Sequence, residues 1–127
     1  MKVLVIDAQG GGIGKQVVAA IKHKQPHIEI TAVGTNSTAT TAMLKAGSDH
    51  AATGENAVVV GCRTADVIIG PIGIVIADAM FGEVMAVAVG QSRAKRLLIP
   101  VNHCDNTIVG VSHLSVGNLI EEVLKEI

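Results

Sequence analysis

The sequence predicts an α/β fold: a single doubly wound domain over residues 1–127, with a mostly parallel sheet of about five to six strands in the order 3-2-1-4-5-6. Short apolar runs alternate with helical patterns along the chain, which is typical of parallel α/β sheets. A length of 127 residues fits one domain of this kind. A glycine-rich turn at residues 7–14 follows the first apolar run, and this position favours the stated order over the flavodoxin order.

The first half of the chain alternates strictly between apolar runs and amphipathic segments. The run at residues 3–6 is continuously apolar, as expected of a strand that is buried on both faces. The segment 15–24 carries apolar residues at helical spacing, and Gln25 and Pro26 stop it. The predicted elements are strand 3–6, helix 15–24, strand 28–33, a helix from Asn36 or Ser37 to about Ala46, and strand 50–52.

The second half contains a long segment that is apolar on nearly every side, at residues 72–89. A helix of that composition is buried, and in a chain this small a subunit interface is the expected place. Pro71 suits the first position of such a helix, and Gly82 is its expected break. The predicted elements are helix 54–63, strand 67–69, helix 71–91, strand 97–99, a sixth strand at 108–111, and helix 114–127.

The composition excludes several classes of function. Hydrophobic residues make up 49% of the chain and charged residues 17%, with one Phe and neither Trp nor Tyr. A tyrosine general acid is therefore excluded, and aromatic platforms for single-stranded nucleic acid are missing. The net charge is −1 without a basic run, so we expect no nucleic-acid partner. A nearly neutral, apolar small protein favours self-association, and we expect a homo-oligomer.

The chain shows no signal for a membrane, a disulfide framework or a metal. Its most apolar stretch, residues 67–77, is too short to span a bilayer and is broken by Gly70 and Pro71. Two cysteines, Cys62 and Cys104, favour a reduced, cytoplasmic setting. The five histidines lack metal-ligand spacing, so we expect no metal site.

The glycine-rich turn is the strongest functional signal, because it lies between a buried strand and a helix. The dinucleotide fingerprint G-x-G-x-x-G fits at Gly11 and Gly14 but finds Gln at position 9. The pattern T-G-x-x-x-G-x-G fits at Gly12 and Gly14, with Asp7 and Ala8 in place of Thr and Gly. A phosphate-loop register over residues 11–15 has Gln16 where Mg²⁺ binding needs Ser or Thr. The alternative is a tight turn with close helix packing. The turn residues predicted to bind a phosphate-bearing cofactor are Asp7, Gln9, Gly10, Gly11, Gly12, Ile13 and Gly14.

Two further segments follow predicted strands at the same edge of the sheet. The second strand ends without the carboxylate that usually holds the ribose of NAD. Its polar residues can hydrogen-bond a ribose or a 2′-phosphate, and the alternative is a helix cap. The fourth strand ends at a glycine-rich segment beside the first strand, where a ligand can lie close to the backbone; the alternative is a helix start. The predicted cofactor contacts are Gly34, Thr35, Asn36 and Ser37, together with Gly70, Pro71, Ile72 and Gly73.

Catalytic candidates follow the third and fifth predicted strands. After the fifth strand, His103 could act as an acid or base and Cys104 as a nucleophile. Asn102 in the same loop is predicted to contact the cofactor. The alternative for that loop is a plain surface segment. Glu55 is a third candidate, in a segment where Thr53 and Asn56 have the spacing of a capping box.

The chain resembles a small bacterial family, seen mostly in anaerobes, that is described as the domain of unknown function numbered thirty-eight forty-two. Four segments carry the resemblance: DAQGGGIGK at 7–15, GTNS at 34–37, TGENA at 53–57 and GPIGIVI at 70–76. The resemblance runs from end to end and implies a Rossmann-like fold, without carrying over a catalytic residue. The first third is also similar, more loosely, to NAD(P)-dependent oxidoreductases, whose Tyr-Lys catalysis cannot transfer to a chain without Tyr.

Together these observations predict a small nucleotide-binding protein that holds NAD(P) or a related phosphate-bearing cofactor, with an oxidoreductase activity left open. The alternatives are a non-enzymatic nucleotide or redox sensor, a structural homo-oligomer, and a P-loop-like nucleoside triphosphatase.

Overall fold

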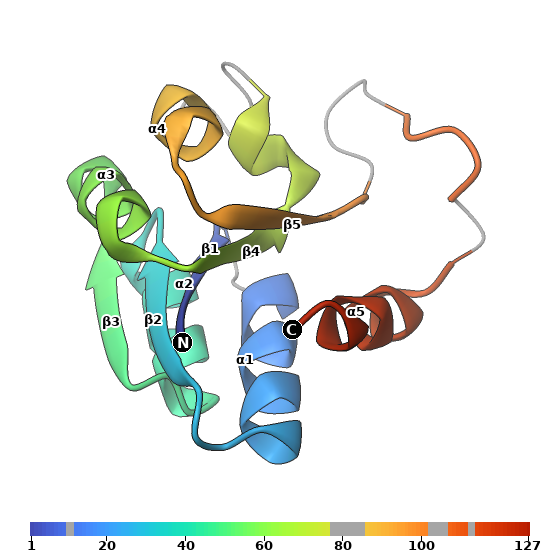
Figure 1. Ribbon diagram of the computed structural model, residues 1–127, viewed down its shortest axis with the longest axis horizontal. Helices are drawn as coiled ribbons and strands as arrows, with labels where there is room; N and C mark the ends of the chain where they lie inside the picture. The colour runs from blue at the N-terminus through green and yellow to red at the C-terminus, as the bar shows by residue number, and fades with distance from the viewer. Residues whose placement is uncertain (10–11, 77–85, 102–106, 112–113) are drawn as a thin grey trace.

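The computed structural model describes residues 1–9, 12–76, 86–101, 107–111 and 114–127. Its centre is a sheet of five parallel strands in the order β3-β2-β1-β4-β5, which confirms the predicted doubly wound arrangement (Figure 1). The strands are β1 (Lys2–Asp7), β2 (Glu29–Gly34), β3 (His50–Thr53), β4 (Val67–Pro71) and β5 (Lys95–Ile99).

Helices cover both faces of the sheet (Figure 1). One layer holds α1 (Gly12–Lys24), which packs against both α2 (Ser37–Lys45) and α5 (Val116–Lys125). The other layer holds α3 (Glu55–Thr64), which packs against α4 (Ala86–Gln91), and α4 in turn contacts the 3-10 turn η1 (Ile72–Val75). This layering follows from the right-handed connections between parallel strands.

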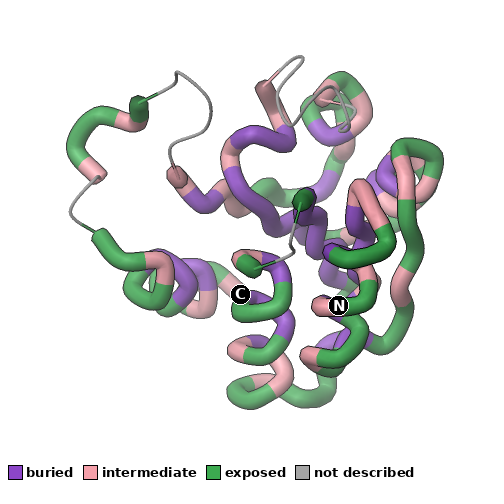
Figure 2. The backbone as a smooth tube through the Cα atoms, turned by 180° about the vertical axis from the view of Figure 1, so that it is seen from behind, coloured by how far each residue is buried: buried purple, intermediate pink, exposed green. Residues whose placement is uncertain are grey.

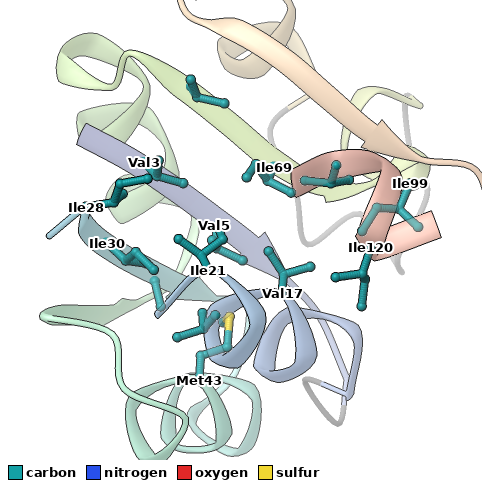
Figure 3. Packing of buried hydrophobic residues seen from close by; sticks show 14 of the residues in the cluster. Val3, Val5, Val17, Ile21, Ile28, Ile30, Met43, Ile69, Ile99 and Ile120 are labelled. Carbon is teal, nitrogen blue, oxygen red and sulfur yellow. The ribbon is translucent and has the colours of Figure 1, made fainter. Parts of the chain in front are cut away.

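The central strand divides its side chains between two apolar cores. Val3 and Val5 point into the core beneath α1, α2 and α5, whereas Leu4 and Ile6 point into the core beneath α3 and α4. Figure 3 shows the first core, where Val17 from α1 and other side chains gather over the sheet. The buried residues accordingly lie mainly along the inner strands and the inward sides of the helices (Figure 2). A strand that is buried on both faces explains why the first apolar run is continuous.

Two predicted elements of the second half are wrong. The proposed sixth strand at residues 108–111 is irregular: Val109 is 91% exposed and Gly110 has a φ of 90°, so neither residue joins the sheet. The proposed helix from Pro71 does not begin there, because Pro71 is the last residue of β4 and pairs with Ile99. Only η1 and α4 are helical among the described residues of this segment.

The described parts of the long apolar segment are only partly buried in the single chain, so the predicted interface stays a prediction. Ile74 and Val89 are fully buried in the core beneath α3 and α4, whereas Val87 is 65% exposed. Residues 77–85, with the expected break at Gly82, lie outside the described residues. Within the described ranges, no helix has the length and apolar character needed to cross a membrane.

The two edges of the sheet carry charged or short strands. On β5, Lys95 and Arg96 are exposed, and Lys95 Nζ lies 3.0 Å from Glu126 Oε2. On the opposite edge, β3 has four residues, and His50 Nε2 lies 3.3 Å from Glu29 Oε1 on β2.

Candidate functional site

The carboxyl ends of the strands bring the predicted segments together. Asp7 at the end of β1 pairs with Gly34 at the end of β2, and Gly34 pairs with Thr53 at the end of β3. On the other side, Val5 of β1 pairs with Ile69, so Gly70 follows one step further along β4. In open α/β sheets this edge is where ligands bind.

Asp7 faces the inside of the glycine turn. Its carboxylate accepts hydrogen bonds from the backbone N–H of Ala8 at 2.8 Å and from that of Gly14 at 2.6 Å, and the residue is buried. Burial raises the pKa of the Asp7 carboxyl, and the backbone N–H groups of Gly14, Ala8 and Ile13 oppose that rise. The side chain therefore holds the turn against the first turn of α1.

Gly14 is the packing glycine of the turn. A Cβ atom there would lie 2.5 Å from Met43 Sδ and 2.9 Å from Asp7 Cβ. The absence of a side chain at Gly14 therefore lets α1 pack closely against both β1 and α2. The third glycine of the dinucleotide fingerprint has the same role in helix packing. The alternative interpretation of the turn, close helix packing, is correct for this residue.

Gly12 lies in a different environment, at the first position of α1. A Cβ atom there would have no heavy atom of the described residues within 4 Å, the neighbouring residues and the backbone of α1 itself aside. Packing therefore does not require glycine at position 12, and its backbone is open to an approaching group. The start of a helix also carries free N–H groups and the positive end of the helix dipole.

Gln9 supplies the left-handed conformation that the fingerprint assigns to its first glycine. Its φ is 52°, and among the described non-glycine residues it alone has a positive value. The sequence places Gln where the fingerprint has glycine, and the backbone nevertheless follows the left-handed path.

The end of β2 forms the second part of the site. The Asn36 side chain caps α2 by accepting a hydrogen bond from Ala39 N at 2.9 Å, which confirms the expected helix cap. Thr35 donates its backbone N–H to the Asp7 carbonyl, while Thr35 Oγ1 is buried and finds no hydrogen-bond partner among the described residues. Gly34 is a packing residue, because a Cβ there would lie 2.5 Å from Thr40 N. Ser37 is exposed at the start of α2.

The end of β3 differs from the expected capping box. Gly54, with a φ of 106°, is the residue before α3, and it makes no side-chain cap. The Thr53 hydroxyl instead lies 2.7 Å from the hydroxyl of Thr40. Glu55 is the first residue of α3 and is exposed.

The end of β4 is packed more tightly than a ligand cradle. A Cβ at Gly70 would lie 2.6 Å from the Ile6 carbonyl oxygen, so this glycine serves the contact between β4 and β1. Pro71 and Gly73 are buried, and Ile72 is half-buried. Within residues 70–73, Ile72 is therefore the residue exposed enough to contact a ligand.

Several predicted site residues fall outside the described residues: Gly10, Gly11, Asn102, His103 and Cys104. Within the described ranges, no group of three or more His, Cys, Asp or Glu side chains could hold a metal ion.

A cavity of about 750 Å³ opens beside the site, between α1 and α2. Lys15 lines it from α1, and Ser37 and Thr38 line it from the first turn of α2. Lys45, in the last turn of α2, marks its far end. Sequence reasoning missed Thr38 and considered Lys15 only as the end of the phosphate-loop register, because the packing of α1 on α2 brings the two residues to one cavity.

The model of the family described as "Domain of unknown function (DUF3842)" matches residues 2–127, and the chain belongs to this family. No curated protein matches the chain. Among solved structures, the crystal structure of a dodecameric FMN-dependent UbiX-like decarboxylase from Escherichia coli O157:H7 is similar at 18% identity and a TM-score of 0.49. The similarity covers 100% of this chain and 78% of that one.

Proposed function

We propose that this member of the DUF3842 family is a nucleotide-binding protein, which holds NAD(P) or a related phosphate-bearing cofactor at the carboxyl edge of its sheet. The observation that carries the proposal is the open backbone of Gly12, at the start of α1 and next to the end of the central strand. A side chain is absent where packing would permit one, and close approach of a ligand to the backbone is a physical reason for that absence.

The backbone N–H groups at the start of α1 are divided between the Asp7 carboxylate and the proposed phosphate. Asp7 takes the N–H of Gly14 on the inner side, so a phosphate is left with the outward N–H groups at the beginning of α1. The helix dipole favours an anion there. When bound, the cofactor would supply the redox or group-transfer chemistry, while this chain binds and orients it.

Thr35 supports the placement of the ribose. Its buried hydroxyl has no hydrogen-bond partner in the part of the chain that the structure describes, which is a costly state for a polar group. A rotation about the Cα–Cβ bond would offer this hydroxyl to a sugar or phosphate oxygen beside β2. In the proposal, one set of residues shapes the carboxyl edge of the sheet: Asp7, Gly14, Gly34 and Gly70. A second set contacts the cofactor: Gln9, Gly12, Ile13 and Thr35.

The first test is the absorbance spectrum of the purified protein, with mass spectrometry of whatever heat releases. A chain without Trp and Tyr is nearly transparent at about 280 nm, so a band near 260 nm after removal of nucleic acid belongs to a bound ligand. An adenine dinucleotide in the released fraction would support the proposal.

The second test is calorimetry with NAD⁺ and NADP⁺ on Gly12→Val. We expect about a hundredfold loss of affinity without loss of folding, because the valine blocks the approach to the backbone. Gly90→Val is the matched control, since a Cβ at Gly90 in α4 also meets nothing within 4 Å. Unchanged affinity in Gly12→Val would remove the site.

A homo-oligomer remains part of the proposal. Val87 on α4 is 65% exposed and lies in the segment 72–89 for which the sequence predicts an interface, and Val60 on the neighbouring α3 is 48% exposed. We expect light scattering to give a dimer or a larger assembly, and Val87→Asp to shift it toward the monomer. A wild-type monomer at micromolar concentration would contradict the proposed interface at these side chains.

Turnover measurements distinguish the two functional alternatives. Tight cofactor binding without turnover would favour the sensor, and turnover by the isolated protein would favour the oxidoreductase.

A further inference from the structure

The cavity between α1 and α2 adjoins the position at which the proposed function places the adenosine ribose. Ser37 and Thr38 form the first turn of α2, which starts three residues after Gly34 ends β2. Lys15 projects into the same cavity from α1, one residue after the packing glycine Gly14. Three polar side chains from two helices therefore line one cavity near the end of β2.

The polar side chains that line this cavity carry hydrogen-bond donors. The described lining includes lysine, serine and threonine side chains and no carboxylate. The Asn36 Oδ1 atom, a side-chain acceptor in the loop before α2, is already engaged by Ala39 N. Two free ribose hydroxyls need an acceptor such as Asp or Glu, whereas a phosphate needs donors and a cation.

Lys15 is available as that cation. It makes no ion pair or hydrogen bond with the part of the chain that the structure describes. Lys22, two turns further along the same helix, shows the contrasting case: its Nζ lies 2.7 Å from Asp49 Oδ2. A lysine free of carboxylate partners keeps its full charge for an anion in the cavity.

We propose that the cavity between α1 and α2 is the subsite for a phosphate on the adenosine ribose, so that the protein selects NADP(H) over NAD(H). Lys15 supplies the charge, and the hydroxyls of Ser37 and Thr38 donate hydrogen bonds to the phosphate oxygens. This inference rests on the proposed function, because it needs the dinucleotide to lie along the carboxyl edge.

The test is calorimetry with NADP⁺ and NAD⁺ at one fixed ionic strength. We expect wild-type protein to bind NADP⁺ at least about tenfold more tightly than NAD⁺. Lys15→Gln should weaken NADP⁺ by about tenfold and change NAD⁺ by less than about twofold. Lys15→Arg should retain the preference, because it keeps the charge.

Two further variants separate the subsite from general surface charge. Lys24→Gln removes an exposed lysine at the last position of α1, outside the lining of this cavity, and should leave both affinities unchanged. Ser37→Asp installs a carboxylate at the first position of α2, where it suits the helix, and should reverse the preference toward NAD⁺.

The outcomes distinguish this inference from the proposed function. Equal affinities for NADP⁺ and NAD⁺, or an equal loss of both in Lys15→Gln, would overturn the inference and leave dinucleotide binding intact. Binding of neither dinucleotide would overturn both. A drop in the thermal midpoint of Lys15→Gln without ligand would assign Lys15 to stability, against the inference.

Discussion

The inner and outer sides of the turn between β1 and α1 differ in what a methyl group would meet. On the inner side, at Gly14, it would strike Met43 and Asp7 at 2.5 and 2.9 Å. On the outer side, at Gly12, it would meet nothing within 4 Å. Two glycines separated by one residue are thus present for different reasons.

The difference shows how a glycine-rich motif divides into structural and functional parts. The inner side is completed by the protein itself, because the Asp7 carboxylate already fills it and accepts the N–H of Gly14. On the outer side, none of the described residues fills the space at Gly12, and the proposed ligand would be a physical reason to keep it open. Substitutions should therefore affect stability on one side and binding on the other.

Gly14→Ala should give the largest change in stability. We expect it to lower the free energy of unfolding by about 2–3 kcal/mol, because the new Cβ overpacks against Asp7 Cβ, which the backbone fixes. Gly12→Ala is the matched control, and it should be neutral or stabilising by about 0.5–1 kcal/mol, since alanine favours the helix. Urea denaturation of both variants measures the two effects. Equal stabilities would erase the distinction between the two sides.

Asp7→Asn should change how stability depends on pH. Burial holds the folded pKa of Asp7 above its unfolded value. Its stabilising contribution is therefore complete below the unfolded pKa and is lost as the pH rises through the folded pKa. Asp7→Asn should lack this decline in the free energy of unfolding.

Urea denaturation from about pH 3 to pH 7 measures that difference between wild type and Asp7→Asn. The comparison with the variant is needed because Asp49 acts in the opposite direction: the Ile30 N–H and Lys22 lower its pKa. A wild-type curve parallel to that of Asp7→Asn would mean that Asp7 has no raised pKa.

Gln9→Gly should give the smallest effect. Replacing a residue at a φ of 52° with glycine relieves left-handed strain, and we expect a gain of about 0.5–1 kcal/mol. Gln16→Gly, inside α1, should cost about 1 kcal/mol and provides the contrasting control. Thermal unfolding measures both, and a destabilised Gln9→Gly would show that the Gln9 side chain contributes to the turn.

Local patterns were sufficient to predict the first half of the fold. Its apolar run at residues 3–6 is continuous because Val3 and Leu4 enter different cores, and the helix at 37–45 begins where Asn36 caps it. The predictions for the second half fail where one local pattern suits two structures. Pro71 has a φ of −63°, which fits a helix start or a strand end, and its ψ of 149° accompanies pairing with Ile99.

For the site, the sequence could predict which segments gather at the sheet edge but not their orientation. Parallel strands bring Asp7, Gly34 and Thr53 to one edge once the strand order is known. That Asp7 turns inward, that Gly70 packs on Ile6, and that Lys15 shares a cavity with Ser37 all depend on contacts between distant residues. Composition and spacing do not contain that information.

The charged and short edge strands also restrict how copies of this chain can associate. Joining two sheets edge to edge through β5 would place the charged side chains of Lys95 and Arg96 at the seam, and the four residues of β3 offer few backbone partners. Extension into a continuous intermolecular sheet, the route to fibrils, is thereby disfavoured. An assembly of this protein should therefore form through its helices.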